Sequence, residues 1–253
     1  MLNIFAVLLG AMIGSFLNVC IHRLPREESI VKPGSHCPQC QRPIRFYDNI
    51  PLASYLILRG KCRHCDAPIS LQYPFVEGIT ALSSLCLFAK FGPSWSYLFY
   101  FAFIAALIAI TVIDFYHQII PDVISLPGIG VGLLASFFLP QITFFDSLLG
   151  MLLGGGSLFL VATGYHWLFK REGMGGGDVK LLAMIGAFLG WKSVILTIFL
   201  SSLIGSVTGI LLILMKGKDF KFAIPFGPFL SLGAVLSLFY GERIMRWYFY
   251  LSH

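Results

Sequence analysis

Two aspartates lie where long apolar stretches of the sequence meet polar ones. Asp114 ends an apolar run, and Asp178 begins one directly after a glycine-rich sequence. Ionisable side chains at such boundaries are costly to place in a membrane, so they are candidates for function. If the two carboxylates share a site, they cannot both ionise freely, and they hold one proton between them. The ionised partner can then activate water while the protonated partner polarises a carbonyl, which is the acid–base chemistry of peptide-bond hydrolysis.

The sequence before Asp178 is rich in glycine. Gly173 and the run 175–177 allow positive φ angles and leave room for a substrate backbone to come close. Asp178 then falls in the first turn of the following helix, where the helix dipole favours a carboxylate. The simpler alternative is that both aspartates are interfacial helix caps, since aspartate is a preferred N-cap residue. Asp122, which follows a proline at a predicted helix start, fits the capping role better than Asp114 does.

Four of the six cysteines form two Cys-x-x-Cys pairs. They are Cys37 with Cys40 and Cys62 with Cys65, and twenty-one residues separate the pairs. This spacing is typical of a zinc ribbon, in which each pair supplies two thiolates to a tetrahedral ion. Such a closed site leaves no open position for water, so the metal is expected to be structural. Two disulfides or a redox-active pair are the alternatives, and a reducing cytoplasm disfavours disulfides.

The composition indicates a membrane protein. Hydrophobic residues make up 57% of the chain and charged residues 12%, against about 25% charged residues in soluble domains. The mean hydropathy is +0.82. Eight segments approach the roughly 20 apolar residues that span a bilayer. These segments are approximately 2–22, 74–90, 95–114, 122–139, 144–169, 178–190, 192–215 and 224–240.

We therefore predict an all-α membrane protein with about eight transmembrane helices and a small cytoplasmic zinc-ribbon-like loop domain. Residues 1–22 form the first transmembrane helix, 23–73 the cytoplasmic zinc-binding loop, and 74–253 the transmembrane bundle that carries the aspartates.

The basic residues predict the orientation. If the loop 23–73 is cytoplasmic, fourteen of the eighteen Lys and Arg residues lie on the inner side, as membrane topology requires. Asp114, Asp122 and Asp178 then all lie at cytoplasmic helix ends. The net charge of +6 is thereby explained by topology, and we predict no nucleic-acid partner.

These features together resemble the bacterial type IV prepilin peptidases, which are bifunctional leader peptidase/N-methyltransferases. The resemblance covers nearly the whole chain. The glycine-rich sequence and Asp178 also fit the G-x-G-D pattern of intramembrane aspartyl proteases. The motifs that carry the resemblance are the opening 14–19 with Arg23-Leu24-Pro25, the cysteines Cys37, Cys40, Cys62 and Cys65, Asp114 with Pro121-Asp122, and Gly175-Gly176-Gly177-Asp178.

The resemblance implies a function. It implies cleavage of the basic leader of type IV prepilins or pseudopilins at the cytoplasmic face of the bacterial inner membrane, with Asp114 and Asp178 as the catalytic residues. It also implies N-methylation of the new N-terminus with S-adenosylmethionine as donor. The sequence contains no Rossmann glycine fingerprint for this donor. A donor site near the first loop, with Asn18, Arg23, Glu27 or Glu77, is a hypothesis only.

Two other functions remain open at this stage. A polytopic transporter or zinc-regulated membrane scaffold would use the same carboxylates to carry protons or ions. A peptidase without methyltransferase activity is the narrower alternative. An assay with a prepilin peptide separates the first from a protease, and labelled methyl donor in the same assay separates the second.

Overall fold

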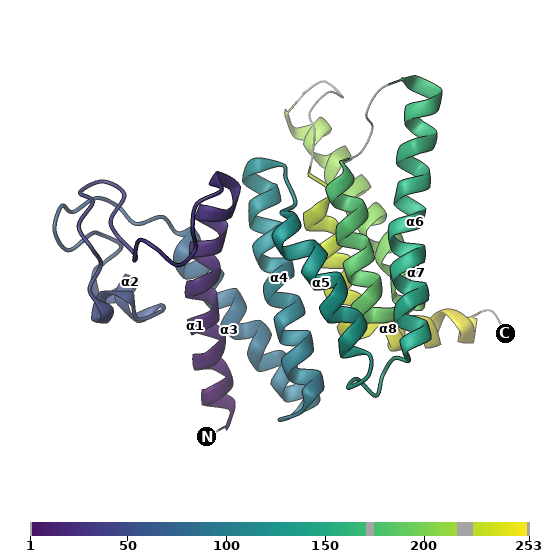
Figure 1. Cartoon of the computed structure of the whole chain (residues 1–253), viewed down its shortest axis with the longest axis horizontal. Coiled ribbons are helices and arrows are strands. Elements are labelled where there is room, and N and C mark those ends of the chain that lie inside the picture. The colour runs from purple at the N-terminus through teal and green to yellow at the C-terminus, as the bar shows by residue number, and fades with distance from the viewer. Residues whose placement is uncertain (1, 171–174, 217–224, 252–253) are drawn as a thin grey trace. The chain divides into compact units, whose positions relative to one another are not determined.

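The computed structural model describes residues 2–170, 175–216 and 225–251, and the described residues form helices joined by loops, with two isolated β-bridges within residues 36–68 (Figure 1). The elements in chain order are α1 (Leu2–Arg23), η1 (Leu24–Arg26), η2 (Phe46–Asn49), α2 (Ala53–Ile57), α3 (Gln72–Phe91), α4 (Trp95–His117), α5 (Asp122–Ala135), α6 (Phe144–Phe169), α7 (Gly176–Lys216) and α8 (Gly227–Leu251). Most of each apolar segment predicted from the sequence lies in a helix, although 136–139 follow the end of α5 and 225–226 precede α8.

The prediction of an all-α membrane protein is confirmed. Within the described residues, five helices are long and apolar enough to cross a membrane, namely α1, α3, α4, α6 and α7, and α5 is a shorter apolar helix. Two of the predicted segments, 178–190 and 192–215, lie within α7, which consists of two helices that meet at Gly190. Gly190 has φ 77° and ψ 169° and marks the kink between these two helices. The protein is therefore a multi-pass membrane protein.

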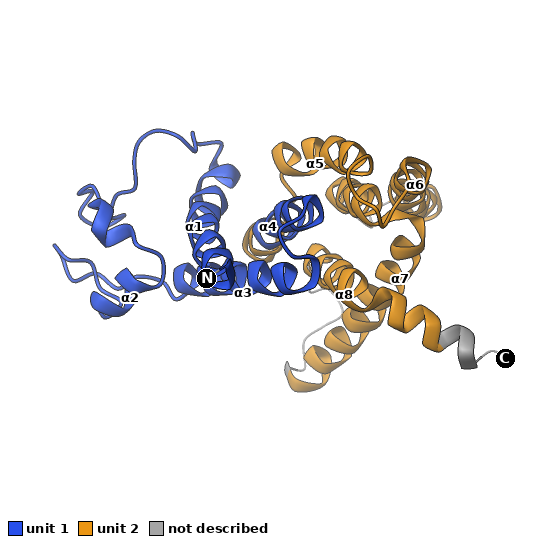
Figure 2. Cartoon of the chain, turned by 90° about the horizontal axis from the view of Figure 1, so that it is seen from below, with its two compact units in different colours: residues 1–109 blue, residues 110–253 orange. Residues whose placement is uncertain are grey.

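The chain forms two compact units, residues 1–109 and 110–253 (Figure 2). In the first unit, α1 and α3 pack in opposite directions. Asn18 Nδ2 donates to the carbonyl of Tyr73 at 3.1 Å, and Ser84 Oγ donates to the carbonyl of Ala6 at 2.7 Å. Because these hydrogen bonds join both ends of the helix pair, they set its register in a setting where lipid drives little association.

In the second unit, α6 and α7 approach each other through glycine. A Cβ added to Gly186 would lie 2.0 Å from the carbonyl oxygen of Gly150, so the two backbones are in direct contact. The capping box of Thr143 and Asp146 begins α6. The indole N–H of Trp191 donates to Asp146 Oδ1 at 3.2 Å, which ties the start of α6 to the α7 kink.

Candidate active site and metal centre

Asp114 lies in the last turn of α4 and is 5% exposed. Its Oδ2 accepts a hydrogen bond of 3.0 Å from the backbone N–H of Gly227, the first residue of α8. The first N–H groups of a helix lack intrahelical partners and attract negative charge. The start of α8 therefore provides Asp114 with a donor and with a favourable dipole.

Asp178 lies in the first turn of α7, as the sequence predicted. Its side chain is half-buried. Its N–H donates to the carbonyl of Gly175 at 3.2 Å. Both aspartates belong to the second unit. Gly177, which precedes Asp178, and Gly227, which donates to Asp114, both lie against Ile120, so the two aspartates lie in the same part of this unit. The structure thus brings together two side chains that are sixty-four positions apart in sequence.

Ile120 links the surroundings of the two aspartates. A Cβ on Gly177 would lie 2.8 Å from Ile120 Cβ, and a Cβ on Gly227 would lie 3.4 Å from Ile120 Cδ1. The residue beside Asp178 and the donor to Asp114 therefore pack against the same side chain. Sequence reasoning missed Ile120, because an isoleucine between two apolar runs carries no signal of its own.

The role predicted for the glycines before Asp178 was partly wrong. None of the described glycines 175–177 has a positive φ, and Gly176 and Gly177 are the first residues of α7. Gly177 is required instead by its close approach to Ile120. Among the described residues, no atom lies within 4 Å of a Cβ added to Gly176. Gly173 lies outside the described residues.

Asp122 is the first residue of α5, but its side chain does not cap the helix. It accepts two hydrogen bonds from Lys180 Nζ, at 2.7 and 2.8 Å. The capping role predicted for Asp122 was therefore wrong. Since Lys180 is two residues after Asp178, the ion pair joins the start of α5 to the helix that carries Asp178. His117 is exposed at the end of α4.

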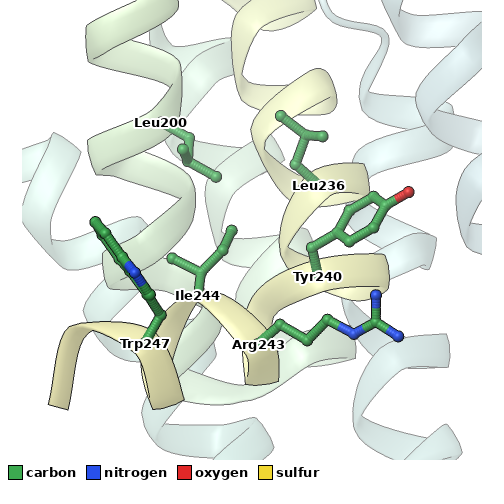
Figure 3. Close-up of a pocket in the computed structure, with 6 residues that line it drawn as sticks. All are labelled: Leu200, Leu236, Tyr240, Arg243, Ile244 and Trp247. Atoms are coloured by element: carbon green, nitrogen blue, oxygen red, sulfur yellow. The ribbon is translucent and has the colours of Figure 1, made fainter. Parts of the chain in front are cut away.

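A groove of about 370 Å³ lies between α7 and α8 (Figure 3). Neither aspartate lines it, and we assign it no part in the reaction. It is lined by Leu200, Leu236, Tyr240, Arg243, Ile244 and Trp247.

The four predicted metal ligands come together in the first unit. The sulfur atoms of Cys37, Cys40, Cys62 and Cys65 all lie within 4.8 Å of one another, and none of them is in a disulfide. The distance between the Sγ atoms of Cys37 and Cys65 is 3.8 Å. Four thiolates at about 2.3 Å from a tetrahedral zinc ion lie about 3.8 Å apart, so the cluster fits zinc.

The two Cys-x-x-Cys turns have the same backbone. The residue after the second cysteine, Gln41 or Asp66, has a positive φ in both turns, 58° and 55°. The N–H of this residue donates to the carbonyl of the first cysteine, at 2.9 and 3.1 Å. Isolated bridges at His36–Pro43 and Lys61–Pro68 close the turns. This repeated geometry is that of paired zinc knuckles and explains why each pair presents two thiols to one point.

The surroundings of Cys62 and Cys65 shift the pKa values of these two thiols in opposite directions. Backbone N–H groups of His64 and Cys65 lower the pKa of Cys62 to about 7. The N–H of Ala67 lowers the pKa of Cys65, but partial burial and the neighbouring thiols raise it by more, to about 12. A divalent ion overrides both shifts, because it holds each sulfur as the thiolate.

Two parts of the chain match models of known protein families. Residues 8–91 match the model of the bacterial peptidase A24 N-terminal domain, and residues 101–210 match that of the type IV leader peptidase family. The chain belongs to the type IV leader peptidase family. The first match includes the four cysteines and the second both aspartates, so the resemblance found from the sequence is confirmed.

Full-length relatives in this family are similar over almost the whole chain. A protein from Aeromonas hydrophila is 40% identical over 269 residues, which cover 95% of this chain and 91% of the relative. One from Pseudomonas aeruginosa is 40% identical, covering 96% and 91%. One from Pseudomonas putida is 37% identical, covering 94% and 91%. All three are named prepilin leader peptidase/N-methyltransferase. No solved structure matches the chain.

Proposed function

We propose that this chain is a prepilin leader peptidase and N-methyltransferase, and that Asp114 and Asp178 are its catalytic pair. The observation that supports this most is the position of the two aspartates in the same part of one unit, next to the family match over residues 101–210. The substrates are type IV prepilins or pseudopilins, whose basic leader is removed.

The two aspartates differ in their surroundings, and this suggests how they divide the work. Asp114 is buried and accepts the N–H of Gly227, which stabilises its ionised form and fixes its orientation. Asp178 is less buried. We assign the water-activating role to ionised Asp114, which takes a proton from water and then passes it to the leaving amine. Asp178 donates its proton to the carbonyl oxygen and regains one from the tetrahedral intermediate as the peptide bond breaks. No metal ion takes part in these steps.

The zinc ion is structural in this proposal. Cys37, Cys40, Cys62 and Cys65 hold it and so fix the loop between α1 and α3. A salt bridge of 2.6 Å between Arg63 and Asp48 and the guanidinium of Arg63 over the Tyr47 ring at 5.6 Å add support beside the metal. With four thiolates bound, the ion has no open position for a reactant.

S-adenosylmethionine is the methyl donor in this proposal, and it acts as a substrate. Of the residues suggested for its site, Arg23 is occupied by the carbonyls of Ser29 and Pro33 and therefore has a structural role. Asn18 is buried, and its Oδ1 has no hydrogen-bond partner in the structure. Glu77 already accepts the N–H of Leu52, so Asn18 is the side chain to test first for donor binding.

The proposed location is the bacterial inner membrane, with the aspartates and the cysteine loop on the cytoplasmic side. The distribution of Lys and Arg supports this orientation. Labelling of an introduced cysteine on each side of α1 in intact cells tests it.

The function is tested by incubating the purified protein in detergent with a prepilin peptide and measuring product masses. Cleavage alone gives a shortened product, and added donor increases the product mass by one methyl group. A shortened product that never gains the methyl group supports the peptidase without the transferase. Intact substrate under conditions where a known family member cleaves it contradicts the proposal.

A further inference from the structure

The loop between α1 and α3 exposes large apolar side chains. Leu56 and Ile57 of α2 are 76% and 71% exposed, and Phe46 of η2 is 87% exposed. Single exposed apolar residues are common in proteins, but a group of them on one short segment marks a surface that contacts something apolar. The position of α2 relative to α1 and α3 indicates what that partner is.

The packing of α1 against α3 fixes the height of the loop. Gly14 of α1 lies against the Cα of Glu77 in α3, so these two residues are level with each other. Gly14 is nine residues before Arg23, the end of α1, which corresponds to about 13 Å along the helix axis. Because α3 begins five residues before Glu77, its start lies only about 6 Å below the end of α1.

Glu77 holds α2 at this height. Its Oε2 accepts the N–H of Leu52 at 2.7 Å, and Leu52 immediately precedes α2. Glutamate on α3 reaches toward the N-terminus of its helix, so α2 lies between the level of Gly14 and the end of α1. Figure 1 shows α2 alongside α1, short of the end at which α1 enters the loop. Because α1 and α3 are membrane-spanning candidates, this level falls within the half of the span that is nearer the loop.

The charges next to α2 suit such a position. Arg59 and Lys61 follow α2 and are exposed, and neither forms an ion pair within the described residues. Arg63, by contrast, is paired with Asp48. Cations close to apolar side chains at an interface find their partners in lipid phosphates.

We propose that α2 anchors the zinc loop in the adjoining leaflet of the membrane, with Leu56 and Ile57 among the outer parts of the acyl chains. Arg59 and Lys61 bind the phosphates of anionic phospholipids. The anchor does not depend on the proposed reaction, since it follows from the packing of the first unit alone. The α2 anchor keeps the zinc knuckles next to the membrane surface.

The test measures depth with spin labels on the full-length, zinc-loaded protein in liposomes of phosphatidylethanolamine and phosphatidylglycerol. Cys20 and Cys86 are first replaced by alanine, and one new cysteine is labelled in each variant. The labelled substitutions are Leu56→Cys, Ile57→Cys, Val31→Cys and Leu8→Cys. Zinc content and cleavage activity show that each variant is folded.

Val31 is the matched control. It lies in the same loop and is 75% exposed, against 76% for Leu56. Arg23 donates to the carbonyls of Ser29 and Pro33 on either side of it, so Val31 is held at the end of α1 and not at the level of α2. Leu8, 58% exposed in the middle of α1, gives the value for a lipid-facing position. We expect labels at 56 and 57 to collide with oxygen more than with a water-soluble nickel chelate, as at 8, and the label at 31 to do the reverse.

Two results overturn the anchor. Nickel access at 56 and 57 equal to that at 31 places α2 in water. Low access to both probes shows that protein, from this chain, a second copy or a partner, covers the segment. The lipid headgroup is tested by replacing phosphatidylglycerol with phosphatidylcholine, which should make the label at 57 shallower. The double substitution Arg59→Gln and Lys61→Gln should abolish this difference, and a label whose depth never depends on lipid charge refutes the phosphate contacts.

Discussion

The backbone N–H of Gly227 donates a hydrogen bond of 3.0 Å to Oδ2 of Asp114, across 113 positions of sequence. A Cβ at Gly227 would lie 2.6 Å from the same oxygen. The contact therefore requires glycine on steric grounds. It also places a buried carboxylate at the positive end of α8, where the unpaired N–H groups of the helix favour its ionised form.

Replacing Gly227 with alanine is expected to reduce cleavage severely. The added methyl group cannot fit beside Asp114, so either the carboxylate or the start of α8 must move. A displacement of about 1 Å in a catalytic group can cost roughly 100-fold in rate. We expect a loss of that order in kcat for a prepilin peptide, with little change in the amount of folded protein.

Gly156→Ala in α6 is the control, since nothing lies within 4 Å of a Cβ at that position. It should cleave at the rate of the native protein. Equal rates for Gly227→Ala and Gly156→Ala would show that the contact with Asp114 has no role in the reaction.

The ion pair of Asp122 and Lys180 is expected to matter less than the aspartate pair. Both side chains are partly exposed, 55% for Asp122 and 38% for Lys180, and exposed pairs contribute at most about 1 kcal/mol. Asp122→Ala should therefore lower kcat by about fivefold or less, which corresponds to that energy.

Exchanging the two charges separates a positioning role from a direct one. If the pair only joins the start of α5 to α7, the double variant Asp122→Lys with Lys180→Asp should recover activity that either single variant loses. A double variant as inactive as Asp178→Ala would instead place one of these side chains in contact with the substrate.

Zinc retention is expected to fall with decreasing pH. The ion must displace the protons of four thiols, and the pKa of Cys62 in the free cluster is about 7. Above that pH the Cys62 thiolate is already present, and below it the proton on Cys62 competes with the metal. Dialysis against a chelator at a series of pH values, followed by metal analysis, should show about one zinc per chain at neutral pH and loss in mild acid.

Cysteine substitutions provide the comparison for this measurement. Cys37→Ser and Cys62→Ser should each lower zinc content, and Cys20→Ser, in α1 outside the cluster, should leave it unchanged. If the folded protein contains no metal and its four clustered cysteines form disulfides, this would contradict both the zinc site and the proposed cytoplasmic location of the loop.

Close packing of α6 on α7 should make Gly186 intolerant of a side chain. An alanine Cβ would lie 2.0 Å from the Gly150 carbonyl oxygen, and overpacking of this kind typically costs about 1–3 kcal/mol. Gly186→Ala should lower the midpoint of thermal unfolding in detergent relative to Gly156→Ala. Unchanged unfolding would mean that the two helices separate easily.

The sequence predicted most of the fold because hydropathy and length define membrane helices strongly. It also predicted two separate segments on either side of Gly190, and the structure agrees, because the non-helical angles of Gly190 divide α7 into two helices. Gly190 and Lys192 interrupt the apolar pattern at the same point of the sequence. The cysteine cluster was predictable because two short turns with fixed spacing determine where the sulfur atoms point.

The surroundings of the aspartates were harder to predict. The irregular start of the last helix was expected from its prolines, but the pairing of Gly227 with Asp114 depends on tertiary packing between distant segments. Asp122 was assigned to a helix cap from local sequence alone, whereas its partner Lys180 is 58 positions away. Local patterns identify the residues with chemistry, and long-range contacts decide which of them act together.

The central claim is that Asp114 and Asp178 jointly catalyse peptide cleavage, and isosteric substitution tests it most directly. Asp114→Asn and Asp178→Asn keep the size of each side chain but remove the charge and the exchangeable proton. Glu242→Gln, at an 88% exposed carboxylate in α8, is the control. The rate of prepilin peptide cleavage by mass spectrometry should fall to background in both aspartate variants and stay native in the control, whereas cleavage that persists in either aspartate variant would contradict the account.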